Sequence, residues 1–325
     1  CRYCKVKRRV QPPFAERRVS YTRAFARYVL DLCKVMTKKD VARLLPVGWD
    51  VVKSIHKRYL KKHFSKPRLR DIGRIAIDEI SIGRNHRYLT VVMDLETGAV
   101  VHVGDGKGAD ALKEFWTRLG RAHGKLEAVA TDMSPAYISA VLEKAPEATL
   151  VFDRFHIVKL FNDKITQLRR ELQREAEDSD REVLKGIRWL LVHNPENVRS
   201  DHKHKKRLQD ALELNQPLAL FYYMKDEFRR FWEMPGKEKA RRFLEGWIAR
   251  AKASNVRLLQ QLGRTLENHS YGLLAWYDYP ISTGPLEGTN NKIKTLQRQA
   301  YGYRGEEHFR LLIFACHESK YALVG

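Results

Sequence analysis

The sequence predicts an α/β protein with a mixed five-stranded sheet, a large all-helical insertion domain and an N-terminal helix-turn-helix. Three observations lead to this prediction. Short apolar runs alternate with amphipathic helical patterns between residues 71 and 165. Helical apolar spacing then continues through residues 166–279. A strongly basic segment with two short helical patterns precedes the sheet.

Charge is distributed unevenly along the 325 residues, whose formal net charge is +22. Residues 1–70 hold 21 Lys or Arg and 4 Asp or Glu, whereas residues 71–153 hold 9 and 13. This basic N-terminal part favours binding to a polyanion, with a surface that only aids solubility as the alternative. Four Cys fit a reducing compartment, and we see neither a signal peptide nor a run near the ~18 apolar residues of a membrane span. We therefore expect a cytoplasmic protein with no membrane partner.

The chain opens with a C-x-x-C pair, Cys1 and Cys4, which has the spacing of half a zinc site. Zinc needs four ligands, so two upstream ligands would have to complete the site. Two unpaired surface Cys are the alternative. We expect residues 1–35 to be a remnant of a zinc-binding segment and a basic linker.

Residues 36–70 carry the pattern of a helix-turn-helix. Thr37 and Asp40 resemble a capping box, and Asp50 can cap a second helix after the break at residues 46–49. In this motif the second helix enters the major groove of DNA. A plain basic hairpin is the alternative. The predicted outward, DNA-binding side chains of the second helix are Lys53, His56, Lys57 and Arg58.

The sheet is predicted from five runs rich in β-branched and apolar residues, at 74–82, 88–98, 99–106, 126–132 and 148–153. Amphipathic helical patterns at 108–124 and 134–146 separate the later strands. Three meandering strands followed by alternating helices and strands imply a mixed sheet. We expect the sheet domain to span residues 71–165 and, after the helical insertion at 166–279, to be completed by helices within 280–325.

Two acids, Asp78 and Asp132, end the first and fourth predicted strands. These strands can lie side by side, which would bring both carboxylates to one edge of the sheet. A cap or loop role is the alternative for either acid. Two close carboxylates repel each other unless a cation lies between them, and Mg²⁺ prefers oxygen ligands. Two such ions can activate an attacking oxygen and stabilise the leaving oxygen of a phosphodiester.

Glu287 is the third candidate acid, because it opens a predicted helix that has no other acid before Glu306. Glu79 is weaker, since neighbouring residues of a strand point to opposite faces. Amide and cationic groups behind Glu287 are expected to meet DNA phosphates. These groups are Asn290, Asn291, Lys294 and Arg298, of which the last three share one helix face with Glu287.

The order of these residues resembles the DDE transposases with an RNase H-like fold, and more narrowly the ISL-three family of bacterial insertion-sequence transposases. The matching stretches are "IAIDEIS", "VATDMS", "VFDRFHIVKL", "STGPLEGTNNKIKTLQRQAYGYR" and "EEHFRL". The resemblance runs from about residue 1 to the end. It implies binding to terminal inverted repeats, followed by DNA cleavage and strand transfer. The implied triad is Asp78, Asp132 and Glu287, with two Mg²⁺ or Mn²⁺ ions.

The resemblance also bears on partners. Two DNA ends must be held together, so we expect a homodimer or a larger assembly on double-stranded DNA, associated with the bacterial nucleoid. The family carries an N-terminal zinc-binding segment, of which "CRYC" matches the second half. The alternatives are a non-catalytic DNA-binding regulator derived from a transposase and an RNase H-like nuclease.

Asp153 and His156 match a D-x-x-H signature found between the second and third acids of several transposase families. They could orient catalytic groups, contact DNA, or simply cap the strand–helix junction. Phe155 between them is expected in the core. Of the helical-domain tryptophans, Trp189, Trp232, Trp247 and Trp276, most are expected in the core. Trp189 is the candidate for stacking on an extruded base.

Overall fold

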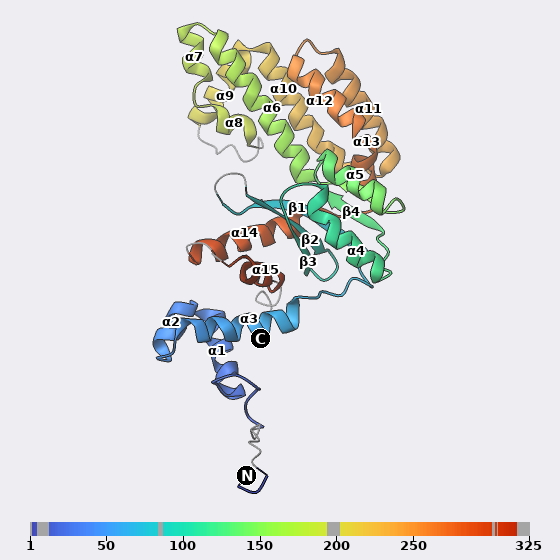
Figure 1. Ribbon diagram of the computed structural model, residues 1–325. Helices are drawn as coiled ribbons and strands as arrows, with labels where there is room; N and C mark the ends of the chain where they lie inside the picture. Colours follow the sequence, from blue (N-terminus) through green and yellow to red (C-terminus); the bar gives the residue numbers. More distant parts are fainter. Residues whose placement is uncertain are drawn as a thin grey trace.

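The computed structural model describes residues 2–4, 13–83, 87–193, 202–300, 303 and 305–316. Figure 1 shows three parts in a row: the helix-turn-helix, the sheet with its covering helices, and the helical domain. Within these described ranges, none of the helices has both the length and the apolar character needed to cross a membrane.

The five predicted strands are confirmed, with their ends trimmed. They are β1 (Arg74–Ser81), β2 (Tyr88–Asp94), β3 (Val100–Asp105), β4 (Ala128–Thr131) and β5 (Thr149–Phe152). Their order in the sheet is β3-β2-β1-β4-β5. The first three strands pair antiparallel, whereas β4 and β5 run parallel to β1. The sheet is therefore mixed, and β1 lies beside β4 as predicted.

Helices cover both faces of the sheet (Figure 1). Side chains alternate along β1, so Ile75 and Ile77 join one core cluster while Ala76 and Ile80 join another. Asp78 points to the same face of the sheet as Ala76 and Ile80, and α14 lies on that face. The first cluster includes η1 (Ala109–Leu112), α4 (Lys113–Arg121) and α5 (Pro135–Lys144), and the second includes α14 (Gly284–Gln299) and α15 (Glu306–Phe314).

The helical domain begins with α6 (Arg154–Glu175), which runs through the boundary predicted at residue 166. One continuous helix therefore links the sheet to the helical domain. Phe161 of α6 packs against Phe228 and Trp247, with ring centroids 4.8 and 5.4 Å away. The domain also contains α7 (Asp178–Leu184), α8 (Arg188–Val192), α9 (His202–Leu214), α10 (Gln216–Phe228), η3 (Arg229–Glu233), α11 (Lys237–Ala253), α12 (Arg257–Asn268), α13 (Ser270–Leu274) and η4 (Ala275–Tyr277).

Three helices form the N-terminal domain: α1 (Arg23–Val35), α2 (Lys38–Leu44) and α3 (Trp49–Phe64). Thr37 caps α2 by accepting a hydrogen bond from the Asp40 N–H at 3.2 Å, as predicted. Gly48, not Asp50, occupies the cap position of α3, and Asp50 lies in its first turn, where an acid is also favourable. The expected linker contains α1, whose buried Val29 packs into one core with α2 and α3.

The second helix of the helix-turn-helix also packs on the sheet domain. Leu60 of α3 is buried in a small apolar cluster with Leu311 of α15. On the rim of this contact, the ammonium groups of Lys57 and Lys61 lie 2.5 and 3.5 Å from the Glu307 carboxylate. The C-terminal half of α3 is therefore held against α15.

Candidate active site

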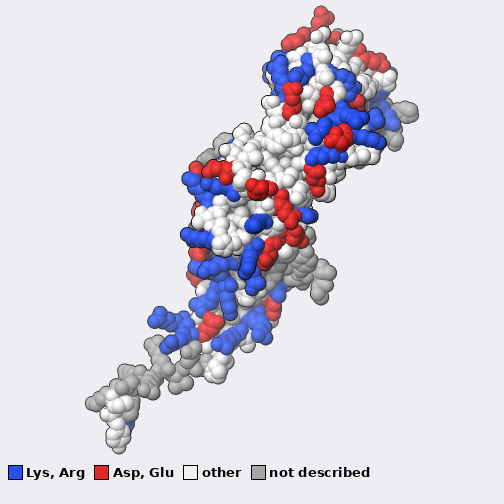
Figure 2. Space-filling view, turned by 90° about the vertical axis from the view of Figure 1, so that its right-hand side faces the viewer, with Lys and Arg blue, Asp and Glu red and all other residues white. Residues whose placement is uncertain are grey.

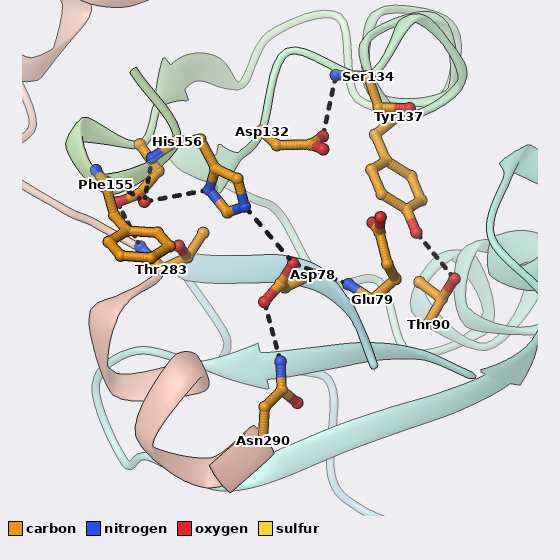
Figure 3. A network of polar contacts seen from close by, with 11 residues as sticks. Asp78, Glu79, Thr90, Asp132, Ser134, Tyr137, Phe155, His156, Thr283 and Asn290 are labelled. Atoms are coloured by element: carbon orange, nitrogen blue, oxygen red, sulfur yellow. Dashed lines mark hydrogen bonds and ion pairs between the residues drawn. The ribbon is translucent and has the colours of Figure 1, made fainter. Parts of the chain in front are cut away.

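Asp78 and Asp132 lie at one edge of the sheet, as the strand order predicts (Figure 3). Asp132 directly follows β4. Asp78, however, lies inside β1 and does not end it, because β1 continues to pair with β2 as far as Ser81. The pairing of β1 with β4 stops at Ala76, two residues earlier. The Asp78 side chain therefore emerges where β1 has lost its β4 neighbour.

The Asp78 carboxylate is held by three groups from three elements (Figure 3). Its Oδ1 accepts a hydrogen bond from the Glu79 N–H at 2.9 Å, and its Oδ2 accepts one from Nδ2 of Asn290 at 2.8 Å. Nε2 of His156 lies 4.0 Å from Oδ1. Burial raises the pKa of Asp78 to about 6, against the opposing effects of His156 and the Glu79 N–H.

Glu79 belongs to the same acidic group, which its orientation on a strand had not indicated. Figure 3 shows its carboxylate between Asp132 and Tyr137. Burial, followed by the negative charge of Asp132, raises the pKa of Glu79. Asp132 itself accepts a hydrogen bond from the Ser134 N–H at 2.9 Å. Three carboxylates thus converge at the edge of the sheet.

Asp153 is a buried clamp at the junction of β5, α6 and α14; its side chain is only 2% exposed. One oxygen accepts hydrogen bonds from the N–H groups of Phe155 and His156 and caps α6. The other accepts the Thr283 N–H at 3.1 Å, directly before α14. Burial alone would raise the pKa of Asp153, but the hydrogen bonds from His156 and Thr283 outweigh it and lower the pKa. This arrangement favours an orienting role over a DNA contact.

His156 lies between two acids. Its Nδ1 is 3.2 Å from Asp153, and its Nε2 points toward Asp78. Burial would lower the pKa of His156, but the hydrogen bond to Asp153 and the charge of Asp78 more than compensate and raise it. Phe155, expected in the core, is 48% exposed. The buried stripe of α6 is set by Ile157 and Phe161, which leaves Phe155 outside it.

Glu287 lies in the first turn of α14, half-buried, with its N–H bonded to the Thr283 carbonyl at 2.8 Å. Across the described part of the chain, no three His, Cys, Asp or Glu side chains are grouped closely enough to hold a metal ion. Asp78, Glu79 and Asp132 lie near one another at the sheet edge (Figure 3), but among the described residues they do not form a metal-binding cluster, either alone or with Glu287.

The donor atoms at this edge nevertheless suit a hard divalent cation. Carboxylate oxygens of Asp78, Glu79 and Asp132 lie there, whereas Oδ1 of Asn290, which is buried with no hydrogen-bond partner among the described residues, points away from them (Figure 3). Carboxylate and amide oxygens are the ligands that Mg²⁺ accepts in proteins. The residue types fit such an ion, but among the described residues they are not grouped closely enough to enclose one.

The basic face of α14 is only partly as predicted. Asn291, Lys294 and Arg298 are exposed. Asn290, predicted to bind DNA with them, is instead 4% exposed and bonded to Asp78. One residue step rotates a helix by about 100°, which turns Asn290 toward β1 and Asn291 toward solvent.

As on α14, only some of the four side chains of α3 that were predicted to bind DNA lie as predicted. Lys53 lies 4.6 Å from the Trp49 ring centroid, and Arg58 pairs with Glu16 at the surface. Lys57 faces Glu307. His56, predicted to face outward, packs in the interface with α15, its ring 5.6 Å from that of His308. Burial lowers the pKa of His56 to about 3. Figure 2 shows many Lys and Arg side chains gathered over this end of the molecule.

The remaining predicted sites lie away from the acids. Trp232 and Trp247 are buried and Trp276 is half-buried, whereas Trp189 is 62% exposed, with the Arg188 guanidinium 5.0 Å from its ring centroid. Trp189 therefore stays a stacking candidate. Cys1 lies outside the described residues and Cys4 is exposed, so the zinc prediction stays a prediction.

Two comparisons place the chain in a family. Residues 75–313 match the family model of a DDE-type transposase, and residues 10–60 match the helix-turn-helix domain of transposase family ISL3. The transposase for insertion sequence element IS1001 of Bordetella parapertussis is 34% identical over 85% of this chain and 68% of its own length. The transposase for insertion sequence element IS1557 of Mycobacterium tuberculosis is 27% identical over 92% of this chain and 72% of its own.

The mixed sheet, with Asp78 within β1 and Asp132 directly after the adjoining β4, is completed by C-terminal helices and defines a transposase core of the RNase H-like type. The chain belongs to the ISL3 family of DDE transposases. It is thus a nucleic-acid-processing enzyme of a family that generally uses divalent metal ions, and its helix-turn-helix indicates DNA binding.

Proposed function

We propose that this protein cuts DNA at the ends of an insertion sequence and joins the freed ends to target DNA, with Asp78, Asp132 and Glu287 as the catalytic acids. The observation that carries the proposal is the joining of three elements at one sheet edge. Asp78 and Asp132 come from the neighbouring strands β1 and β4. The hydrogen bond from Asn290 to Asp78 fixes α14, and with it Glu287, against β1.

Two phosphoryl transfers make up the proposed reaction. In the first, a water oxygen bonds to the phosphorus at the element's end, the bond to the 3′ oxygen breaks, the water's proton passes to solvent, and the freed 3′ oxygen takes up a proton from solvent. In the second, that 3′-hydroxyl loses its proton to solvent, attacks a target phosphate and displaces another 3′ oxygen, which is protonated in turn. Mg²⁺ or Mn²⁺, held by the three acids, would supply activation of the attacking oxygen and stabilisation of the leaving one.

The chain's own residues prepare the acids for this chemistry. Asn290 and the Glu79 N–H fix the rotation of the Asp78 carboxylate. His156 places its imidazole ring between Asp78 and Asp153, whose carboxylates favour the protonated form of the ring. Asp153 accepts hydrogen bonds from the backbone at the start of α6 and directly before α14. These bonds hold the first turn of α14, which carries Glu287, beside the start of α6. Such preorganisation matters for the rate of the reaction, because a catalytic group misplaced by about 1 Å can cost ~100-fold.

DNA would be held on both sides of the acids. The exposed groups on α14, Asn291, Lys294 and Arg298, would contact phosphates beside the cut. Lys53 and Arg58 of α3 would read the terminal inverted repeat in the major groove. Trp189 would stack on a base, and two copies of the chain would hold the two ends. Cys1 and Cys4 would be two of the four ligands of a zinc site.

Alanine substitutions test the proposal. Asp78→Ala, Asp132→Ala and Glu287→Ala should each abolish Mg²⁺-dependent cleavage of labelled inverted-repeat DNA while binding of that DNA in EDTA survives. Glu147→Ala, an exposed acid before β5, is the matched control and should cut normally. Cleavage that persists in all three variants would refute the assignment. Binding without cleavage by the wild type would favour a regulator.

A further inference from the structure

Phe155 is an exposed aromatic residue in the first turn of α6, next to the acidic edge of the sheet. It is 48% exposed, although the buried stripe of the same helix begins two residues later at Ile157. A large apolar ring left in water forgoes the free energy that burial would provide. A single exposed apolar residue is ordinary on a protein surface, however, so exposure alone assigns Phe155 no role.

The backbone places Phe155 beside the start of α14, which carries Glu287. The Phe155 N–H donates a hydrogen bond of 3.1 Å to Asp153, and the other oxygen of Asp153 accepts the Thr283 N–H, also at 3.1 Å. The Thr283 carbonyl in turn accepts the N–H of Glu287 at 2.8 Å. Phe155 therefore lies at the point where α6 and α14 both begin.

The side chain of Phe155 is also linked to the acids of the sheet. Its ring packs against the His156 ring in a T-shaped contact, with the centroids 5.6 Å apart (Figure 3). Nε2 of His156 lies 4.0 Å from the Asp78 carboxylate. One side chain thus separates the Phe155 ring from Asp78, and the capped backbone at the start of α6 holds that ring in place.

The charges around Phe155 indicate which kind of molecule would contact the ring. Arg154 and Lys159, on the first two turns of α6, are exposed cations. Lys159 lies near enough to the acids to oppose the larger effects of burial and of Asp132 on the pKa of Glu79. Such a surface attracts a polyanion, whereas an apolar partner protein would have to remove water from the cations. An aromatic ring among cations is the composition with which proteins bind DNA bases and phosphates together.

We propose that Phe155 stacks on the base of a nucleotide that flanks the cut phosphate and so positions the end of the element at the acids. The base of a nucleotide projects away from its phosphate, so a ring beside the acids can meet a base while the acids meet the phosphate. Stacking needs no particular base, because every base has a flat π-face. This inference rests on the proposed function, since it assumes that the phosphate at the element's end is cut at these acids.

A structural role for Phe155 makes a different prediction. If the ring only packs on His156, an apolar side chain of similar size should replace it, and Phe155→Leu should cut DNA like the wild type. If the ring stacks on a base, a flat aromatic side chain is required. Phe155→Trp should then cut within ~3-fold of the wild-type rate, whereas Phe155→Leu and Phe155→Ala should both be at least ~10-fold slower.

The test combines these variants with DNA that lacks one base. Inverted-repeat duplexes carry a single abasic site, moved in turn through the nucleotides on each side of the cut, and single-turnover cleavage in Mg²⁺ is measured. At one position, loss of the base should slow the wild type about as much as Phe155→Ala does, and both changes together should cost no more than either alone. Tyr223→Ala is the matched control, because Tyr223 is also an exposed aromatic but lies on α10 of the helical domain; its effect should be independent of every abasic site.

A second measurement needs no cleavage. The base analogue 2-aminopurine, whose fluorescence reports stacking, replaces each of these bases in turn, and the signal is followed as the protein binds in EDTA. Phe155→Ala, with wild-type circular dichroism, should lose the fluorescence change at the position where the abasic site and the variant are coupled, while Tyr223→Ala keeps it.

The outcomes separate the inference from the proposed function. Wild-type cleavage by Phe155→Ala and Phe155→Leu, or costs that simply add at every abasic position, would overturn the inference and leave the proposed function intact. A fluorescence signal that Phe155→Ala does not alter, or that the wild type never gives, would also exclude the base contact. If the wild type does not cut inverted-repeat DNA, yet its fluorescence change is lost in Phe155→Ala, the proposed cleavage fails and the base contact stands.

Discussion

Replacing Asp153 by Asn should loosen two helices at once. The two Asp153 oxygens serve different elements, since one caps α6 and the other accepts the Thr283 N–H that precedes α14. Asn keeps the shape but offers only one acceptor oxygen. Its NH₂ group must then face either the cap N–H groups or the Thr283 N–H, donor against donor. The N–H groups at the start of α6 and the N–H of Thr283 therefore cannot all find an acceptor.

The size of the effect follows from these contacts. Losing an N-cap costs about 1 kcal/mol, and a hydrogen bond to a charged group about 1.5–3 kcal/mol. Because Asp153 is 2% exposed, water cannot replace the lost acceptor. We expect Asp153→Asn to lower the free energy of unfolding by about 2–4 kcal/mol. Cleavage by the folded fraction should fall ~10–100-fold, because the start of α14 is released.

Urea denaturation followed by circular dichroism measures the first effect, and cleavage normalised to the folded fraction measures the second. Asp163→Asn is the matched control, since this acid lies on the same helix but is exposed; it should stay within about 0.5 kcal/mol of the wild type. Wild-type stability and cleavage in Asp153→Asn would show that the junction does not depend on this carboxylate.

Three further predictions concern the rest of the molecule. Glu307→Gln should release Lys57 from α15 and tighten inverted-repeat binding about three- to tenfold at low salt, with a steeper salt dependence in a titration. Gly272→Ala should cost about 1–3 kcal/mol in urea unfolding, because the added Cβ would lie 2.5 Å from Phe152 ring carbons. Burial lowers the pKa of His308 to about 4, below the value of about 6.5 in the unfolded chain, so the unfolded state takes up a proton first as the pH falls. The free energy of unfolding should therefore fall by about 2 kcal/mol between pH 6.5 and pH 4.5, measured by urea unfolding.

Matched variants control each of these predictions. Glu306→Gln removes a neighbouring acid that pairs with Arg87 and should leave DNA binding unchanged; equal tightening in both Gln variants would indicate a general charge effect. Gly246→Ala has open space for its Cβ and should stabilise the protein slightly. If Gly272→Ala also stabilises the protein, Gly272 does not pack closely on the Phe152 ring. His308→Gln should remove the extra loss of stability at low pH; an unchanged pH profile would contradict the assignment to His308.

Much of the sheet and its acids could be predicted, because the signals are local. Apolar runs gave the five strands, and the chain order made β1 and β4 neighbours, which brought Asp78 and Asp132 together. The prediction that Asp78 ends its strand was wrong, since the carboxylate interrupts the apolar run while the pairing of β1 with β2 continues.

The misplaced residues depended on information that is not local. The sequence could not tell which of two adjacent Asn residues faces the sheet, because that depends on how α14 is rotated against β1. His56 was misplaced since nothing in the helical pattern indicates that α15, some 250 residues later, covers that side of α3. Phe155 could have been predicted correctly, as it lies off the stripe formed by Ile157 and Phe161.

The central claim is that these acids cut and join DNA at the ends of an insertion sequence. The most direct measurement incubates the wild-type protein with end-labelled inverted-repeat DNA, a target plasmid and Mg²⁺, and maps every product at nucleotide resolution. We predict a nick at the element's end that leaves a 3′-hydroxyl, followed by covalent joining of that strand to the plasmid, both absent in Glu287→Ala. Cuts scattered without regard to the inverted repeat, or the same products from Glu287→Ala, would contradict it.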